Sequence, residues 1–372
     1  MKRIILVILM CILSFRMFAQ FGPDYIPTQI IHPDNSVSFT MAAPEAKSVK
    51  IVIGMDHFSM TNDGNGLWSV TTTPIEPGFH YYFLEIDGAS VVNPASEAYF
   101  GFSKTTSGID IPEEGTDYLE IKDVPHGQVR MVNYYSEVEK EWRPMCVYTP
   151  PGYEKGKKKY PVLYIQHGGG EDQRGWVSQG KMANIMDNLI AEGKAVPMIL
   201  VAANGNVRMQ TPDNNGYTAD SMEPFRREML ENIIPYVDKT FRTKKGPKNR
   251  GMCGLSMGSG QTFYIGLRAP EVFGYIGMFS SGIFGGISTS SAPFDIEAEM
   301  PGVYTDTNAY NSQHKLFYIS CGEQDNRITY TTRVVEELKA HGVKVTFETY
   351  PGNHDWQPWR KSLHSFAQML FK

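Results

Sequence analysis

Three unbroken apolar runs in the second half of the chain constrain its fold more than any other feature. They span residues 161–165, 198–203 and 316–320, and their length and continuous hydrophobicity are typical of strands buried on both faces. Segments with apolar residues at helical spacing follow these runs. These segments are residues 182–190, 225–237, 334–338 and 359–370. Strands that alternate with helices predict an α/β fold with a mostly parallel sheet.

The first half of the chain has a different pattern. Short alternating runs at 36–41, 49–54, 68–73 and 81–86 are separated by Gly, Pro and Asn/Asp turn signals, which predicts a small all-β, Ig-like sandwich over 20–100. Residues 101–125, with Pro112 and Pro125, are expected to form a linker. The α/β domain is then expected over 126–372.

The N-terminus has the layout of a signal peptide. Lys2 and Arg3 precede an apolar run over 4–15, and Ala19 offers a small residue before a cleavage site. About twelve apolar residues are too few for a membrane anchor, which needs ~20, and no other segment could span a membrane. We therefore expect residues 1–19 to be removed and the mature protein to be secreted or periplasmic.

Composition excludes several classes of function. The chain carries 35 Lys+Arg against 40 Asp+Glu, a net charge of -5, which leaves no basic surplus for binding nucleic acid. Its 4 cysteines lie in no zinc-binding spacing, so neither a disulfide scaffold nor a metal site is expected. We expect no cofactor, and the oligomeric state is left open.

A candidate nucleophile lies in the motif Gly254-Leu255-Ser256-Met257-Gly258. A short strand precedes this G-x-S-x-G pattern and a helix follows it, which is the context that the motif requires. The tight turn needs small residues two positions before and after Ser256, and it places the hydroxyl at a helix N-terminus.

A base and an acid follow in the order that serine hydrolases of this type use. Asp325 comes after the strand at 316–320, and His354 follows the next strand, at 343–350; both are therefore expected at the carboxyl edge of the sheet. Asp325 is favoured over Glu323 as the acid, and Asp355 is too close to its neighbour to orient the imidazole ring. The acid would accept the Nδ1 proton of His354 and fix its tautomer.

Oxyanion donors are expected from two places. The backbone N–H of Met257 belongs to the turn itself, and the glycine run at 168–170 can bring the N–H of Gly169 close. A phosphate-binding loop is disfavoured there, because Glu171-Asp172 would repel an anion. His167 is expected to be structural.

The second half resembles carbohydrate esterase family 1, the α/β-hydrolases that include feruloyl esterases and acetyl xylan esterases. The motifs that carry this resemblance are residues 147–153, 160–170 with Gly175-Trp176, 254–258, 322–325, and 352–356 with Trp359-Arg360. The resemblance implies Ser256 as nucleophile, His354 as base, Asp325 as acid, and Met257 with Gly169 as oxyanion donors. These agree with the assignments made from the residues.

The first domain resembles carbohydrate-binding module family 48. This resemblance rests on residues 37–39, 43–44, 66–70, 77–78, 81–83, 87–88 and 93–94. Trp68 and Tyr82 alternate like core residues, so a structural role is as well supported as glycan binding.

Together these features predict a secreted serine esterase that acts on xylan or on feruloylated or acetylated xylo-oligosaccharides, with feruloyl esters favoured. Trp176, Phe284 and Trp356 are candidate contacts for a phenolic acyl group, and residues 283–314 are expected to form a lid or pocket wall. The alternatives are an acetyl xylan esterase, an enterochelin-type siderophore esterase and a catalytically silent carbohydrate-binding protein.

Overall fold

The computed structural model describes residues 28–207, 219–281 and 295–372. The predicted signal peptide therefore lies outside the described residues. These residues form two compact units, one of residues 28–76 with 83–96 and one of residues 77–82 with 97–372. Within these three ranges, no helix has the length and apolar character needed to cross a bilayer.

The N-terminal region is all-β, as the alternating runs predict. One sheet has the order β1-β2-β6-β5 and the other has β4-β3-β7-β10-β9, with β8 beside β7. The strands are β1 (Gln29–Ile31), β2 (Val37–Ala42), β3 (Val49–Ile53), β4 (Asp56–Ser59), β5 (Thr61–Asn62), β6 (Leu67–Thr71), β7 (Gly78–Ile86), β8 (Ala89–Val91), β9 (Ala98–Gly101) and β10 (Lys104–Ile111). Trp68 and Tyr82 are both buried, in line with the core role suggested by their spacing.

The segment predicted as a linker is structured. Residues 101–125 contain β10 and a 3₁₀ turn, η1 (Asp117–Leu119). Strand β10 pairs antiparallel with the start of β7, from Ile111 opposite Gly78 to Ser107 opposite Tyr82, so these residues cluster with the larger unit. Pro and Gly content alone did not reveal this pairing, because the partner strand lies in the predicted sandwich.

The larger unit is built on an eight-stranded sheet with the order β11-β12-β14-β13-β15-β16-β17-β18. Its strands are β11 (Gln128–Ser136), β12 (Glu141–Thr149), β13 (Val162–Gln166), β14 (Ile199–Ala203), β15 (Arg250–Leu255), β16 (Tyr275–Phe279), β17 (Leu316–Gly322) and β18 (Thr346–Tyr350). Only the ladders of β12 with β11 and with β14 are antiparallel. This order, with a mostly parallel sheet, confirms the predicted α/β-hydrolase fold.

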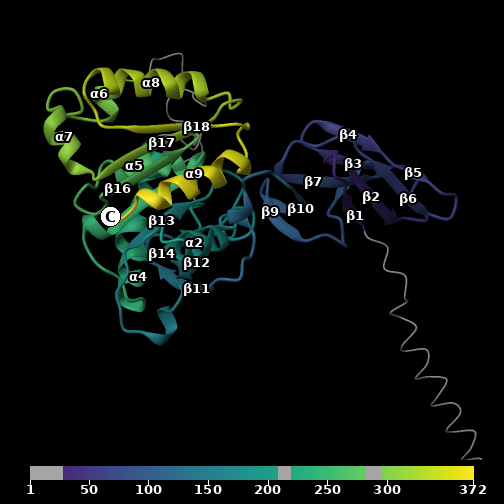
Figure 1. The fold of residues 1–372 in the computed structure, drawn as a ribbon, viewed down its shortest axis with the longest axis horizontal. Helices are drawn as coiled ribbons and strands as arrows, with labels where there is room; N and C mark the ends of the chain where they lie inside the picture. Colours follow the sequence, from purple (N-terminus) through teal and green to yellow (C-terminus); the bar gives the residue numbers. More distant parts are fainter. Residues whose placement is uncertain (1–27, 208–218, 282–294) are drawn as a thin grey trace, which may run out of the picture. The chain divides into compact units, whose positions relative to one another are not determined.

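Helices cover both faces of this sheet (Figure 1). On one face, α2 (Met182–Ala191) packs against α9 (Trp356–Met369). The other face carries α3 (Ala219–Arg227), a π-helical turn at Glu228–Ile233, α4 (Ile234–Thr240), α5 (Met257–Gly266) and α8 (Ile328–Ala340). Strands β13, β14 and β16 are buried along their whole length, because apolar side chains on both faces meet helices.

Residues 295–314, part of the expected lid, contain two short helices. These are α6 (Ile296–Glu299) and α7 (Thr307–Gln313), and each begins at an aspartate whose side chain accepts a backbone N–H. The buried side chains of Ile296 and Tyr310 belong to the core. This part of the segment is therefore packed on the domain, and the rest of the expected lid lies outside the described residues.

Candidate active site

Ser256 occupies a strained turn between β15 and α5. Its backbone has φ 51° and ψ -113°, a conformation that costs a non-glycine residue about 1–3 kcal/mol. A Cβ on Gly254 would lie 2.4 Å from the carbonyl oxygen of Gly258, and one on Gly258 would lie 2.5 Å from that of His167. Glycine is therefore required at both positions of the motif because backbone atoms occupy the space.

The structure brings the three predicted catalytic side chains together. His354 Nε2 lies 2.8 Å from Ser256 Oγ, and His354 Nδ1 lies 2.7 Å from Asp325 Oδ2. The imidazole packs edge to face on Trp359, with ring centroids 5.0 Å apart. With the Nδ1 proton donated to Asp325, Nε2 is free to accept the proton of the serine hydroxyl.

Two neighbouring loops place the acid beside the base. The loop after β17 and the loop after β18 are joined by backbone hydrogen bonds from Glu323 N to Tyr350 O and from Gln324 N to Gly352 O. A Cβ on Gly322 would lie 2.4 Å from the Gly352 carbonyl oxygen, so the loops approach as closely as backbones can. This contact brings Asp325 to His354.

Asp325 is the carboxylate that contacts the histidine. Its Oδ1 accepts the backbone N–H of Arg327 at 3.0 Å, and its side chain is fully buried. Burial raises the pKa of Asp325. The hydrogen bond from His354, the charge of His354 and the remaining hydrogen-bond donors have the larger combined effect, and they lower the pKa to about 2. By contrast, Glu323 accepts from Thr349 and Asp355 caps the N-terminus of α9.

The predicted oxyanion donors border the serine. Met257 is the first residue of α5, where backbone N–H groups have no partner within the helix. A Cβ on Gly168 would lie 3.6 Å from that of Ser256, so the glycine run passes beside the nucleophile. Gly169 is exposed, and its N–H has no partner among the residues that the structure describes.

His167 has a structural place, as predicted. It is 1% exposed, and burial lowers its pKa. Its Nε2 accepts the backbone N–H of Gly205 at 2.9 Å, so Nδ1 carries the proton and donates it to the Gly168 carbonyl at 2.8 Å. The ring thereby fixes the start of the glycine run.

Two of the three proposed substrate contacts, Trp176 and Trp356, are buried. Trp176 and Trp356 are 1% and 2% exposed, and their rings meet edge to face 5.2 Å apart. Trp176 donates its indole N–H to the Gln166 carbonyl oxygen. Both are core residues, so the structure gives them a packing role and their contact with substrate stays a prediction from the sequence. Phe284 lies outside the described residues.

Sequence reasoning missed the support that the glycine run receives from the β9–β10 turn. Ser103 N donates to the Gly170 carbonyl oxygen at 2.8 Å, and a Cβ on Gly170 would lie 3.2 Å from Phe102 Cα. Phe102 is 64% exposed. No local signal could show this contact, because the two segments are far apart in sequence.

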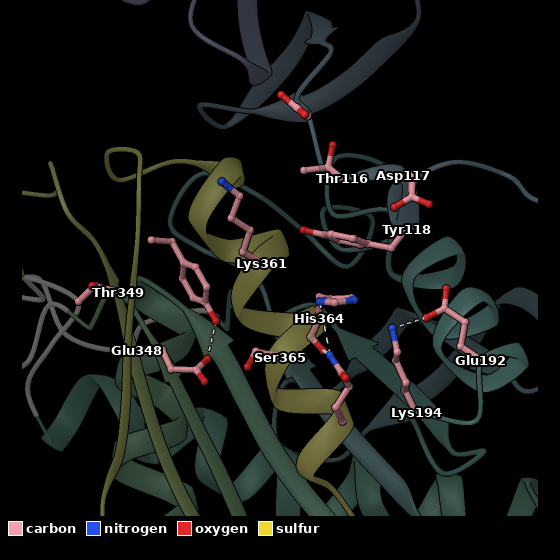
Figure 2. A pocket seen from close by; sticks show the side chains of 14 residues that line it. Thr116, Asp117, Tyr118, Glu192, Lys194, Glu348, Thr349, Lys361, His364 and Ser365 are labelled. Carbon is pink, nitrogen blue, oxygen red and sulfur yellow. Dashed lines mark hydrogen bonds and ion pairs between the residues drawn. The ribbon is translucent and has the colours of Figure 1, made fainter.

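A polar pocket of about 660 Å³ lies between η1, β18 and α9 (Figure 2). Its lysines are paired, Lys194 with Glu192 at 2.8 Å and Lys361 with Glu113 at 2.5 Å. Neither Ser256 nor its two partners line the pocket. We therefore place the ester chemistry at Ser256 and assign no part of it to this pocket.

Comparison with known proteins identifies the family. The model for the family described as putative esterases matches residues 136–369, more than half of the chain. The chain belongs to the esterase family. An endo-1,4-beta-xylanase/feruloyl esterase from Xylanibacter ruminicola is 39% identical over 362 residues, which cover 94% of this chain and 46% of the relative. The esterase thus spans about half the length of that relative.

Solved structures agree with this assignment. A CE1 ferulic acid esterase from the anaerobic fungus Anaeromyces mucronatus has a TM-score of 0.57 at 26% identity, covering 68% of this esterase and 95% of the fungal chain. The enterochelin esterase of Shigella flexneri has a TM-score of 0.66 at 16% identity, covering 94% and 96%, which shows a shared fold alone. The predicted resemblance to carbohydrate esterase family 1 is confirmed.

Proposed function

We propose that this esterase hydrolyses hydroxycinnamoyl esters, above all feruloyl esters, that decorate plant xylan. The observation that carries the proposal is the hydrogen-bonded chain from Ser256 through His354 to Asp325 in a member of the esterase family. The similarity to a xylanase/feruloyl esterase over 94% of the chain supports the choice of substrate.

The first half of the reaction forms an acyl-enzyme. Ser256 Oγ attacks the ester carbonyl carbon while His354 Nε2 takes the hydroxyl proton. The N–H groups of Met257 and Gly169 donate hydrogen bonds to the carbonyl oxygen and stabilise the negative charge that develops on it. When the tetrahedral intermediate collapses, the bond to the sugar oxygen breaks, and His354 gives its proton to the departing alcohol.

The second half releases the acid. A water molecule loses a proton to His354 Nε2 and attacks the acyl carbon, and the bond to Ser256 Oγ breaks as the proton returns to the serine. The products are the free hydroxycinnamic acid and the original hydroxyl. Throughout both halves, the buried Asp325 carboxylate stabilises the imidazolium form of His354.

We further propose that the esterase acts outside the cytoplasm, on the basis of the signal-like segment 1–19, and that xylan or a xylo-oligosaccharide is its partner. The described strands of the N-terminal region supply a β-rich unit whose glycan-binding role remains a prediction from the resemblance to carbohydrate-binding module family 48.

A substrate panel tests this proposal. Purified enzyme is assayed with methyl ferulate, acetylated xylan and a catecholate siderophore ester, and Ser256→Ala is the control. We expect Ser256-dependent release of ferulate with the highest kcat/KM of the three. Faster release of acetate indicates an acetyl xylan esterase, and turnover of the siderophore alone indicates an enterochelin-type esterase; each result rejects the feruloyl assignment.

A further inference from the structure

Glu171, directly after the glycine run, has a buried carboxylate with three hydrogen-bond donors. The residue is 5% exposed. Its Oε2 accepts the backbone N–H of Gly168 at 3.2 Å, and its Oε1 accepts the Tyr81 hydroxyl at 2.9 Å and the Trp356 indole N–H at 3.0 Å. Both oxygens are thus occupied by donors within the larger unit.

These donors come from the segments that form the active site. Gly168 precedes the predicted oxyanion donor Gly169, and Trp356 lies two residues after His354 at the start of α9. Tyr81 lies on β7, and its ring contacts Phe102 of the β9–β10 turn that supports the glycine run, with ring centroids 5.3 Å apart. One carboxylate therefore connects the oxyanion loop to the loop that carries the base.

The donors are directed at Glu171 in a defined way. The phenol oxygen of Tyr81 accepts from the Gln179 side-chain amide at 2.6 Å, so the hydroxyl proton is available for the carboxylate. Burial, followed by the nearby charge of Glu171, raises the pKa of Tyr81 far above its usual value, so the phenol remains a donor at any pH used for assay. Trp356 and Gly168 donate through N–H groups that do not titrate.

Within the described part of the chain, no cationic side chain is bonded to this carboxylate. Its three donors are neutral, and the neighbouring Asp172 pairs with Arg174. Burial raises the pKa of Glu171 to about 7, opposed by the hydrogen bonds from Tyr81, Gly168 and Trp356, and the charge of Asp172 adds to the rise. A buried charge of this kind is costly for folding, so packing alone does not account for a glutamate here.

We propose that Glu171 is a positioning residue for ester hydrolysis: its ionised carboxylate holds the glycine run and the His354 loop in their active arrangement, and its protonation weakens this hold. This inference rests on the proposed serine esterase mechanism. Glu171 itself contacts neither Ser256 nor the reacting atoms; it acts through Gly168 and Trp356.

Protonation has a direct structural consequence. A carboxyl O–H must be directed to an acceptor, but Oε2 faces the N–H of Gly168 and Oε1 faces two further donors. The added proton takes the remaining lone pair of Oε2, which makes that oxygen a weaker acceptor and loosens its bond to Gly168. Loss of the Gly168 bond frees the residue before Gly169, and a weaker bond to Glu171 leaves the Trp356 N–H with its longer bond to the Tyr81 hydroxyl oxygen, at 3.3 Å.

The test compares pH profiles of kcat and KM for hydrolysis of a nitrophenyl ester by the wild type and three variants. In Glu171→Gln, one amide oxygen replaces two carboxylate oxygens, so either Gly168 or the Tyr81–Trp356 pair loses its acceptor. We expect kcat to fall roughly ten- to a hundred-fold with KM within about two-fold, since a misplaced oxyanion donor lowers transition-state stabilisation.

The shape of the profile separates positioning from folding. In the wild type, Glu171 and His354 must both be unprotonated for activity, so the slope of log kcat against pH on the acid side approaches 2. In Glu171→Gln, only His354 must lose a proton, and the slope is expected to be 1. Tyr81→Phe removes a donor that lowers the pKa of Glu171, so its acid limb is expected to move to higher pH. Asp172→Asn is the matched control on the same loop, and its limb keeps the wild-type steepness.

The outcomes are distinguishable. A Glu171→Gln enzyme with wild-type kcat and an unchanged acid limb overturns the inference. If that variant does not fold, an acid limb of Tyr81→Phe at the wild-type position overturns it instead. Full activity in the Ser256→Ala variant would refute the proposed function itself, whatever the activity of the Glu171 variants.

Discussion

Replacing Asp325 by asparagine changes the tautomer of the catalytic histidine without removing a side chain. Asp325 Oδ1 accepts the Arg327 N–H, and Oδ2 accepts the His354 Nδ1 proton. In Asp325→Asn, the amide oxygen stays on the Arg327 side, because an amide nitrogen there would place two donors face to face. The NH₂ group then donates to His354 Nδ1, so the ring proton moves to Nε2, the atom that must accept from Ser256.

The size of the effect follows from this geometry. Nε2 lies 2.8 Å from Ser256 Oγ, and once it is protonated it can no longer act as the base. The same exchange of tautomer in a serine protease lowers kcat by about 10⁴-fold, or about 5.5 kcal/mol of transition-state stabilisation. We expect a loss of similar size here with KM nearly unchanged, since the carboxylate is buried behind the ring.

Steady-state hydrolysis of a nitrophenyl ester at neutral pH measures this loss. Glu323→Gln is the matched control, because Glu323 lies in the same loop but bonds to Thr349 and not to the histidine. We expect the control to keep its activity within about two-fold. A loss of less than ten-fold in Asp325→Asn, or a greater loss in Glu323→Gln, would refute the assignment of the acid.

Three further predictions concern stability. Gly258→Ala forces a Cβ to within 2.5 Å of the His167 carbonyl oxygen, so urea denaturation should show a loss of roughly 1–3 kcal/mol; an unchanged midpoint contradicts this. The pKa of Glu171 is raised from 4.5 to about 7 by burial, so the folded state binds more protons in that range and stability falls by about 3 kcal/mol as pH rises through it. Urea denaturation at pH 5 and at pH 8 gives the free energy of unfolding at each pH. We expect the fall between the two values to be absent in Glu171→Gln, and an equal fall in both proteins would contradict this. The pKa of Asp325 is lowered from 3.8 to about 2, so its stabilising contribution is present above pH 3.8 and is lost as the pH falls toward 2. The free energy of unfolding of Asp325→Asn should therefore fall less than that of the wild type over this range in an acid titration. An identical acid transition in the two proteins would contradict this prediction.

The sequence was most informative where the chemistry itself demands a local pattern. The apolar runs predicted the central strands because strands covered by helices on both faces need unbroken hydrophobicity. The glycines around Ser256 predicted a tight turn, and the structure shows backbone carbonyls where their Cβ atoms would be. Chain order then pointed to Asp325 and His354, which the structure places in hydrogen-bond contact with each other and with the serine.

Long-range contacts set the limit of the prediction. Strand β10 looked like a linker because its partner, the start of β7, lies in a segment assigned to the sandwich. Glu171 was noted only for its charge, since nothing near it in sequence shows that Tyr81 and Trp356 donate to it. Trp176 and Trp356 were predicted as substrate contacts because the sequence does not show whether an aromatic side chain is buried or exposed. In the structure both are buried in the core.

The most direct test of the central claim is ferulate release from a feruloylated xylo-oligosaccharide, measured by chromatography for the wild type and for Ser256→Ala at equal enzyme concentration. We expect rapid release by the wild type and a loss of at least about 10³-fold in the variant, because the substitution removes the nucleophile that forms the acyl-enzyme. Release by Ser256→Ala at the wild-type rate, or no release by the wild type, would contradict the account.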